Sequence, residues 1–171
     1  AVFVAPDGAA DAPGTMEEPL GSVQSAVTQA VAEGKDVYVC VGDYAEGLLV
    51  EAPVRIYGGY DCENGWKRTA GHAKLSPESG VALQIAGVDG HVSLERLSFY
   101  GAAGVEHGES SVGARIVDST DVALTRVDIV ASSGADGAPA APAREHTVLQ
   151  AAKGHDGVNA PQTTNCTYED C

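Results

Sequence analysis

Two nine-residue stretches each contain a change of phase in the alternation of apolar and polar residues. This change is the sequence feature that most constrains the fold. In 92–100 (VSLERLSFY) apolar residues occupy even positions before Glu95-Arg96 and odd positions after it; in 122–130 (VALTRVDIV) the same switch occurs at Thr125-Arg126. Because successive side chains of a strand point to opposite faces, one strand cannot bury both sets. Each stretch is therefore predicted to form two strands that meet at a corner and face one interior. The offset of 30 positions between them is typical of stacked turns of a β-solenoid.

The same pattern extends toward the amino terminus. Alternating valines at 37–41 predict the first strand of the solenoid, and the apolar residues of 48–56 repeat the corner arrangement. The runs 81–87 and 112–118 predict a further pair of stacked strands. We therefore expect an all-β fold, a right-handed parallel β-helix of about three turns.

Glycine and proline mark the expected turns. Pro6-Asp7-Gly8 is expected to end a short strand at 1–5, and Gly58-Gly59 to close the turn that follows 54–56. Ile85 is expected to match Ile116 in the next turn.

A single amphipathic helix is predicted at 22–34. Its apolar residues recur at helical spacing, with Ser22 as N-cap and Gly34 as the residue that ends it. These apolar residues are Val23, Ala26, Val27, Ala30 and Val31. Placed before the first strand, the helix is expected to cap the amino-terminal end of the solenoid.

The length of 171 residues favours one domain, 1–171. It is divided into an amino-terminal strand and capping helix at 1–36, solenoid turns at 37–130 with a loop insertion at about 61–80, and an irregular carboxy-terminal segment at 131–171. Within the insertion, 73–75 is expected to be a short strand that returns to the solenoid, and 147–149 could form one more.

Composition excludes several classes of partner. The net charge of −14 repels nucleic-acid backbones and anionic lipid. No run of 18 apolar residues exists, so no membrane span is predicted. A basic start followed by an apolar segment is also absent, and any signal peptide is expected to have been removed.

The four cysteines, Cys40, Cys62, Cys166 and Cys171, lack the paired spacing of a zinc site. An even count in an acidic, lysine-poor chain points to an oxidising compartment and two disulfides. Three pairings are possible. We favour Cys40 with Cys62 and Cys166 with Cys171, since each holds a local unit together. A secreted or cell-surface protein is therefore expected.

Three residues are candidates for contact with carbohydrate: Trp66, Arg96 and Arg126. Trp66, beside two cations, either stacks on a sugar ring or packs the base of its loop onto the solenoid; the second interpretation is favoured. Arg96 and Arg126 occupy equivalent corners and are expected to stack. Glu95, Asp121 and Asp128 are close enough in sequence to compensate them, which favours a structural charge ladder.

Asp118, Asp121 and Asp128 are candidate ligands for Ca²⁺, although solvated turn aspartates explain them equally well. The five histidines lack metal spacing, and the sequence contains no nucleophile elbow or glycine-rich phosphate loop. No catalytic residues are therefore assigned, and no cofactor is expected beyond possible Ca²⁺.

The segments APDG, APGTMEEPLGSVQSAV, DVYVCVGDYAEGLLV and PVRIYGGYDC resemble the amino-terminal portion of pectin-lyase-like right-handed parallel β-helix proteins. In particular, they are similar to secreted examples of myxobacterial type. The resemblance covers roughly residues 1–130, and its most specific parts are VYVCVGDYAE after the helix and IYGGYDCENGWKR. It implies the parallel β-helix with its capping helix, but little about activity, because this fold carries lyases, hydrolases, adhesins and stalks alike.

Two functions remain open at this point. The favoured one is a non-catalytic extracellular structural, adhesive or assembly module. Its uncapped carboxy-terminal end would be covered by a further domain of a longer chain, a protein partner or a second copy. The alternative is a polysaccharide-binding or Ca²⁺-dependent, lyase-like carbohydrate-active protein.

Overall fold

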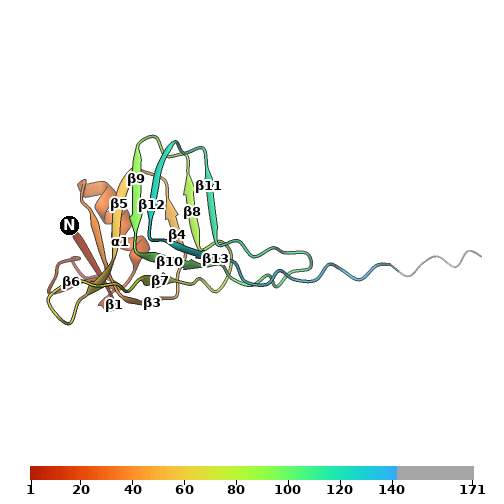
Figure 1. The fold of residues 1–171 in the computed structure, drawn as a ribbon, viewed down its shortest axis with the longest axis horizontal. Coiled ribbons are helices and arrows are strands. Elements are labelled where there is room, and N and C mark those ends of the chain that lie inside the picture. Colours follow the sequence, from red (N-terminus) through yellow and green to blue (C-terminus); the bar gives the residue numbers. More distant parts are fainter. Residues whose placement is uncertain (142–171) are drawn as a thin grey trace, which may run out of the picture. The chain divides into compact units, whose positions relative to one another are not determined.

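The computed structural model describes residues 1–141 and consists mainly of β-strands with one helix (Figure 1). Residues 1–138 form one compact unit, and the account below concerns that unit; the predicted strand 147–149 and the predicted Cys166–Cys171 disulfide lie outside the described residues. The elements are β1 (Val2–Ala9), α1 (Val23–Glu33), β2 (Val37–Cys40), β3 (Gly42–Tyr44), β4 (Leu48–Val50), β5 (Val54–Asp61), β6 (Lys67–Arg68), β7 (Ala73–Leu75), β8 (Leu83–Ala86), β9 (His91–Glu95), β10 (Leu97–Tyr100), β11 (Ala114–Val117), β12 (Asp121–Thr125) and β13 (Asp128–Val130).

The strands form three sheets in which parallel pairing dominates. The long sheet has the order β1-β2-β5-β9-β12, with β6 attached antiparallel to β5. A four-stranded sheet has the order β13-β10-β7-β3, and a three-stranded sheet the order β11-β8-β4. The chain passes from one sheet to the next and returns to the first beside the strand it left. Each circuit therefore adds one strand to each sheet in the later part of the chain.

The predicted register between successive circuits is confirmed. Leu94 of β9 pairs with Leu124 of β12, and Ile85 of β8 pairs with Ile116 of β11. The predicted corners are also present, since β9 lies in the long sheet and β10 in the four-stranded one. Arg96 and Arg126 form these corners with φ of 54° and 53°, a left-handed conformation that bends the chain sharply within one residue.

The helix predicted at 22–34 is confirmed as α1. The Ser22 hydroxyl accepts a hydrogen bond from the Ser25 backbone N–H at 3.1 Å, and Gly34 ends the helix with φ of 62°. The Glu46 carboxylate accepts further bonds from the Ser22 hydroxyl at 2.8 Å and from the Val23 N–H at 2.6 Å. A negative group at this position satisfies free N–H donors and favours the helix dipole. The helix contacts β1, β2, β4 and β5.

Apolar side chains from all three sheets fill the interior. Those that are completely buried include Val37, Val39, Ile56, Leu75, Leu83, Ile85, Val92, Leu94, Leu97 and Phe99. On both sides of the corner at Arg96 the apolar side chains are therefore buried, as the change of phase requires.

Four local predictions were wrong. Pro6-Asp7-Gly8 does not end the first strand, because β1 continues to Ala9. Beyond Val4 the strand leaves β2 and bridges to Leu20 instead, so the missing N–H of Pro6 breaks no ladder. In α1, Val31 is exposed, because the buried face ends at Ala30.

The other two corrections concern β2 and β5 of the long sheet. Val41 is exposed, since β2 ends at the buried Cys40. Gly58-Gly59 does not close a turn: β5 runs through it, with an extra residue relative to β2 and φ of 79° at Gly59. A side chain at Gly58 would collide with the Arg96 carbonyl oxygen, which explains the glycine. The insertion at 61–80 also contains β6 and the predicted strand β7.

The last circuit of the part that the structure describes, formed by β11, β12 and β13, differs from the preceding one in how exposed its apolar side chains are. Ile116, Leu124 and Ile129 are 41%, 37% and 45% exposed, whereas the residues paired with them in the preceding circuit, Ile85, Leu94 and Phe99, are fully buried.

This contrast predicts unequal costs for equal truncations. Leu94→Ala should lower the free energy of unfolding by about 3 kcal/mol, because it opens a cavity in a closed core. Leu124 pairs with Leu94 in the sheet. Leu124→Ala should lower the free energy of unfolding by about 1 kcal/mol or less, since water already reaches that side chain. Urea unfolding followed by far-UV circular dichroism measures both. Equal losses would contradict the described difference in burial.

Candidate functional site

An aromatic row runs across the outer face of the long sheet. Phe3, Tyr38 and Tyr57 occupy paired positions on β1, β2 and β5. Their ring centroids are 5.5 Å apart between Phe3 and Tyr38, and 5.7 Å apart between Tyr38 and Tyr57. The rings are tilted relative to one another and half-buried, an arrangement that stabilises neighbouring strands and leaves part of each ring at the surface.

Arg68 joins this row to the next strand. Its guanidinium lies 5.7 Å from the Tyr57 ring centroid and 5.1 Å from that of Tyr60, distances at which a cation is attracted to a ring face. The same group forms an ion pair with Glu95 at 2.7 Å and donates to the Tyr60 hydroxyl at 3.2 Å. These partners raise the pKa of Arg68 although its partial burial opposes this. The side chain is therefore held in one position.

Three arginines converge on Glu95. Besides Arg68, the Arg96 Nε atom lies 3.8 Å and the Arg126 Nη1 atom 4.0 Å from one oxygen of the Glu95 carboxylate. Arg96 is largely buried and its Nε–H has no hydrogen-bond partner, whereas Arg126 is exposed. One carboxylate thus faces three guanidinium groups, and we call these four residues the arginine cluster. It is a positive region on a chain with a net charge of −14.

The sequence-predicted carbohydrate residues are brought together only in part. Arg96 and Arg126 share Glu95, as expected of a compensated ladder, while Trp66 lies nearer to β1. Its ring is 4.7 Å from Phe3, edge to face, and its indole N–H donates to the Met16 carbonyl at 3.3 Å. Trp66 therefore fixes the base of its loop. It also connects to the arginine cluster through Tyr60, whose ring is 6.4 Å away.

The three candidate Ca²⁺ ligands are not brought together. Asp121 pairs with His91 at 3.1 Å. Asp128 contacts His72 at 2.9 Å and accepts from the Ser98 hydroxyl at 3.1 Å. Asp118 sits at a turn with φ of 48°. Within residues 1–141, no group of three or more His, Cys, Asp or Glu side chains is placed to hold a metal ion.

The predicted pairing of Cys40 with Cys62 is confirmed, with 5.8 Å between their Cα atoms. It ties the end of β2 to the start of the β5–β6 connection. The aromatic row, by contrast, was missed in the sequence. A signal for it existed, because Tyr38 and Tyr57 each stand beside buried Val or Ile positions and so must point outward.

Charge neutralisation at Glu95 tests the arginine cluster. Glu95→Gln should lower the free energy of unfolding by about 1–2 kcal/mol, between the values for exposed and buried ion pairs, because it leaves three cations without their shared anion. Glu78→Gln, at an exposed position outside the cluster, should change little. Urea midpoints for both proteins measure the effect, and equal midpoints would show that the cluster contributes nothing to stability.

Within the described residues, no helix is both long and apolar enough to cross a membrane. Comparison with known proteins assigns no family: no family model matches the chain, and neither a curated protein nor a solved structure matches it.

Proposed function

We propose that this chain is a non-catalytic extracellular module with a structural, adhesive or assembly role, built as a right-handed parallel β-helix of about three turns. Three parallel sheets and the 30-residue registered spacing support the β-helix. The right hand follows the rule for connections between parallel strands. The resemblance of 1–130 to pectin-lyase-like proteins points the same way, and the Cys40–Cys62 disulfide is in line with an oxidising location.

The observation that carries the proposal is the exposed last circuit. Ile116, Leu124 and Ile129 stack on buried residues of the preceding circuit, yet their outer sides face water. Interior positions that are apolar but uncovered mark a contact surface for another protein segment.

The backbone at this end favours the same role. Within the described residues, β11, β12 and β13 each pair on one side only and present unpaired N–H and C=O groups on the other. Such an edge is a template for further strands. At the opposite end α1 packs against β1 and β2, so assembly through the open end would join two copies end to end as a closed pair. A further domain or a different protein partner would cover the same surface.

Self-association is the direct test. Light scattering over a concentration series should give a mass that rises above the monomer, and Leu124→Glu should keep the protein monomeric, because a buried charge in the contact is costly. Val105→Glu, at a highly exposed loop position, is the matched control and should behave as the parent. A monomer throughout, in the parent and in a mixture with candidate partner domains, would contradict assembly through this end.

A second candidate function is binding or lyase-like cleavage of acidic polysaccharide. The arginine cluster favours it, since the guanidinium groups of Arg68 and Arg126, beside an aromatic row, suit a chain of carboxylate-bearing sugars. Incubation with polygalacturonate, with and without Ca²⁺, followed by detection of unsaturated product, distinguishes the two functions. Product formation that is lost in Arg126→Ala or Arg96→Ala would overturn the non-catalytic proposal.

A further inference from the structure

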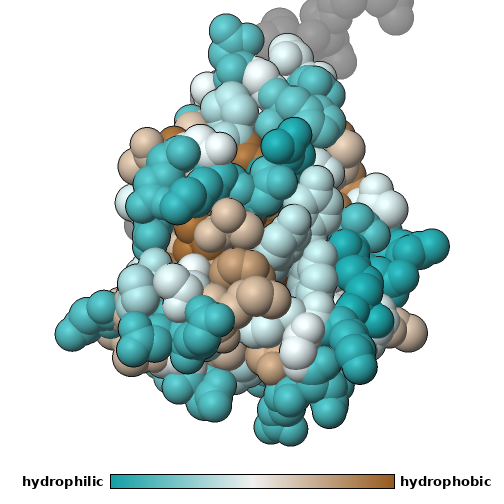
Figure 2. Space-filling view, turned by 90° about the vertical axis from the view of Figure 1, so that its left-hand side faces the viewer, coloured by the Kyte–Doolittle hydropathy of each residue, from teal (hydrophilic) through white to brown (hydrophobic). Residues whose placement is uncertain are grey.

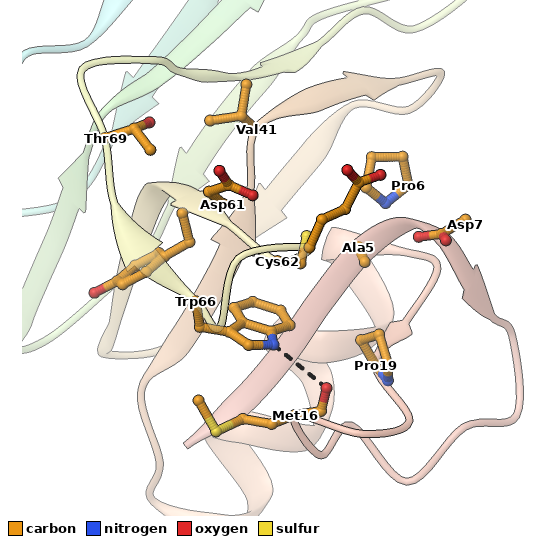
Figure 3. A pocket seen from close by; sticks show the side chains of 12 residues that line it. Ala5, Pro6, Asp7, Met16, Pro19, Val41, Asp61, Cys62, Trp66 and Thr69 are labelled. Atoms are coloured by element: carbon orange, nitrogen blue, oxygen red, sulfur yellow. Dashed lines mark hydrogen bonds between the residues drawn. The ribbon is translucent and has the colours of Figure 1, made fainter.

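An open hollow of about 740 Å³ lies between the end of β1, the loop that follows it and the β5–β6 connection (Figure 3). Its size is within the range of small-molecule sites. Residues from widely separated segments line it, among them Asp7, Met16, Val41, Asp61, Glu63 and Trp66. The hollow is separate from the open carboxy-terminal end, and it adjoins the arginine cluster at Tyr60, whose hydroxyl accepts a hydrogen bond from Arg68.

One wall of the hollow is apolar. Trp66 lies among the lining residues with Met16 on one side and Asp61 on the other (Figure 3). Met16, beside Trp66, is exposed although it is large and apolar, and the exposed Val41 lies beyond Asp61 (Figure 3). Figure 2 faces the side of the molecule that carries α1 and β6 in Figure 1, and it shows apolar residues gathered within a hydrophilic surround. An aromatic ring beside small apolar groups suits the C–H face of a sugar ring.

The charged groups of the hollow are all negative. Asp7, Asp61 and Glu63 line it, and none of the lining residues is Lys, Arg or His. Asp61 accepts bonds from the Asn64 backbone N–H at 3.2 Å and side-chain amide at 2.7 Å, which leaves acceptor capacity on its carboxylate. Asp7 and Glu63 enter no ion pair within residues 1–141. Of the two cations that follow Trp66, Lys67 lies opposite Asp61 in the β5–β6 pairing, and Arg68 is held by Glu95.

The hollow is preformed. The Trp66 indole is fixed by its bond to the Met16 carbonyl and by contact with Phe3. The Cys40–Cys62 disulfide holds the adjoining chain. A ligand would therefore pay little for ordering these walls.

We propose that this hollow binds a glycan carrying protonated amines, such as an oligomer of glucosamine. The ring faces lie on the apolar wall, and the ammonium and hydroxyl groups donate to the carboxylates. Figure 3 shows Asp7 and Asp61 on different sides of the hollow, which fits amines separated by rigid rings better than a single ammonium group. Acidic sugars are repelled by the same carboxylates. The preference is opposite to that of the arginine cluster, so the inference does not depend on the proposed function.

The single tryptophan makes the test direct, because Trp66 is the only indole fluorophore in the chain. The full chain is titrated with a glucosamine oligomer while Trp66 fluorescence is recorded. Calorimetry is measured in parallel, so that binding is detected even if the fluorescence does not change. We expect saturable binding that weakens with added salt. Neutral N-acetylglucosamine oligomer should bind more weakly, and oligogalacturonate should not bind in this hollow.

Two matched double variants distinguish the effect of charge inside the hollow from the effect of the net charge of the protein. Asp7→Asn with Glu63→Gln should weaken binding of the glucosamine oligomer about tenfold or more, since two of the three carboxylates lose their charge. Glu78→Gln with Asp89→Asn makes the same change in net charge at exposed positions outside the hollow and should bind as the parent does. Equal loss in both variants, or no calorimetric binding to the parent, would overturn the proposal.

Two further measurements exclude other ligands and other sites. Tighter binding of an oligolysine peptide would overturn the proposal in favour of a basic peptide ligand. Leu124→Glu and Arg126→Ala, which test the carboxy-terminal end and the arginine cluster, should leave glucosamine binding unchanged. Failure at those sites is therefore distinguishable from failure at the hollow.

Discussion

Registered parallel pairing between successive circuits is the interaction on which this structure depends. Leu124 lies beside Leu94, and Leu94 beside Ile56, so each circuit uses the preceding one to cover its apolar side chains. The sharp corners make this possible, because Arg96 and Arg126 bend the chain within a single residue and keep both flanking strands facing inward. Within residues 1–141, the circuit of β11, β12 and β13 has a neighbour on one side only, and its apolar side chains are partly exposed.

The same register organises the outer surface. Residues that alternate with the buried ones also stack, which places Phe3, Tyr38 and Tyr57 in one row and continues that row to Glu95. The corner arginines follow the spacing of the circuits and so meet at that carboxylate. Rows of surface side chains on such a fold arise because equivalent positions of successive circuits stack. The irregular segments between strands add surface features that occur once, such as the hollow at Trp66.

Features that repeat were predictable from the sequence, and features that arise from single contacts were not. The change of phase at Glu95-Arg96 and Thr125-Arg126 predicted the corners, the stacked leucines and the meeting of two arginines, while helical spacing and caps predicted α1. The bulge at Gly58-Gly59 depends on contact with Arg96, 38 positions further along the chain, and β1 continues past Pro6 because of Leu20. The sequence around each segment does not indicate these contacts with distant residues. The hollow likewise combines residues near 6–19 with residues near 60–69.

The position of the Cys40–Cys62 disulfide has a mechanical consequence. It links the end of β2 to the residue that follows β5, the neighbour of β2 in the long sheet, and both strands are in contact with α1. In the proposed β-helix each circuit contacts mainly its neighbours, so pulling on the chain would remove circuits one at a time, beginning with β11, β12 and β13. Under tension the strands β13, β12 and β11 would separate first, and the Cys40–Cys62 disulfide would keep the amino-terminal circuits together. The molecule would therefore lengthen in steps before the part that the disulfide joins unfolds.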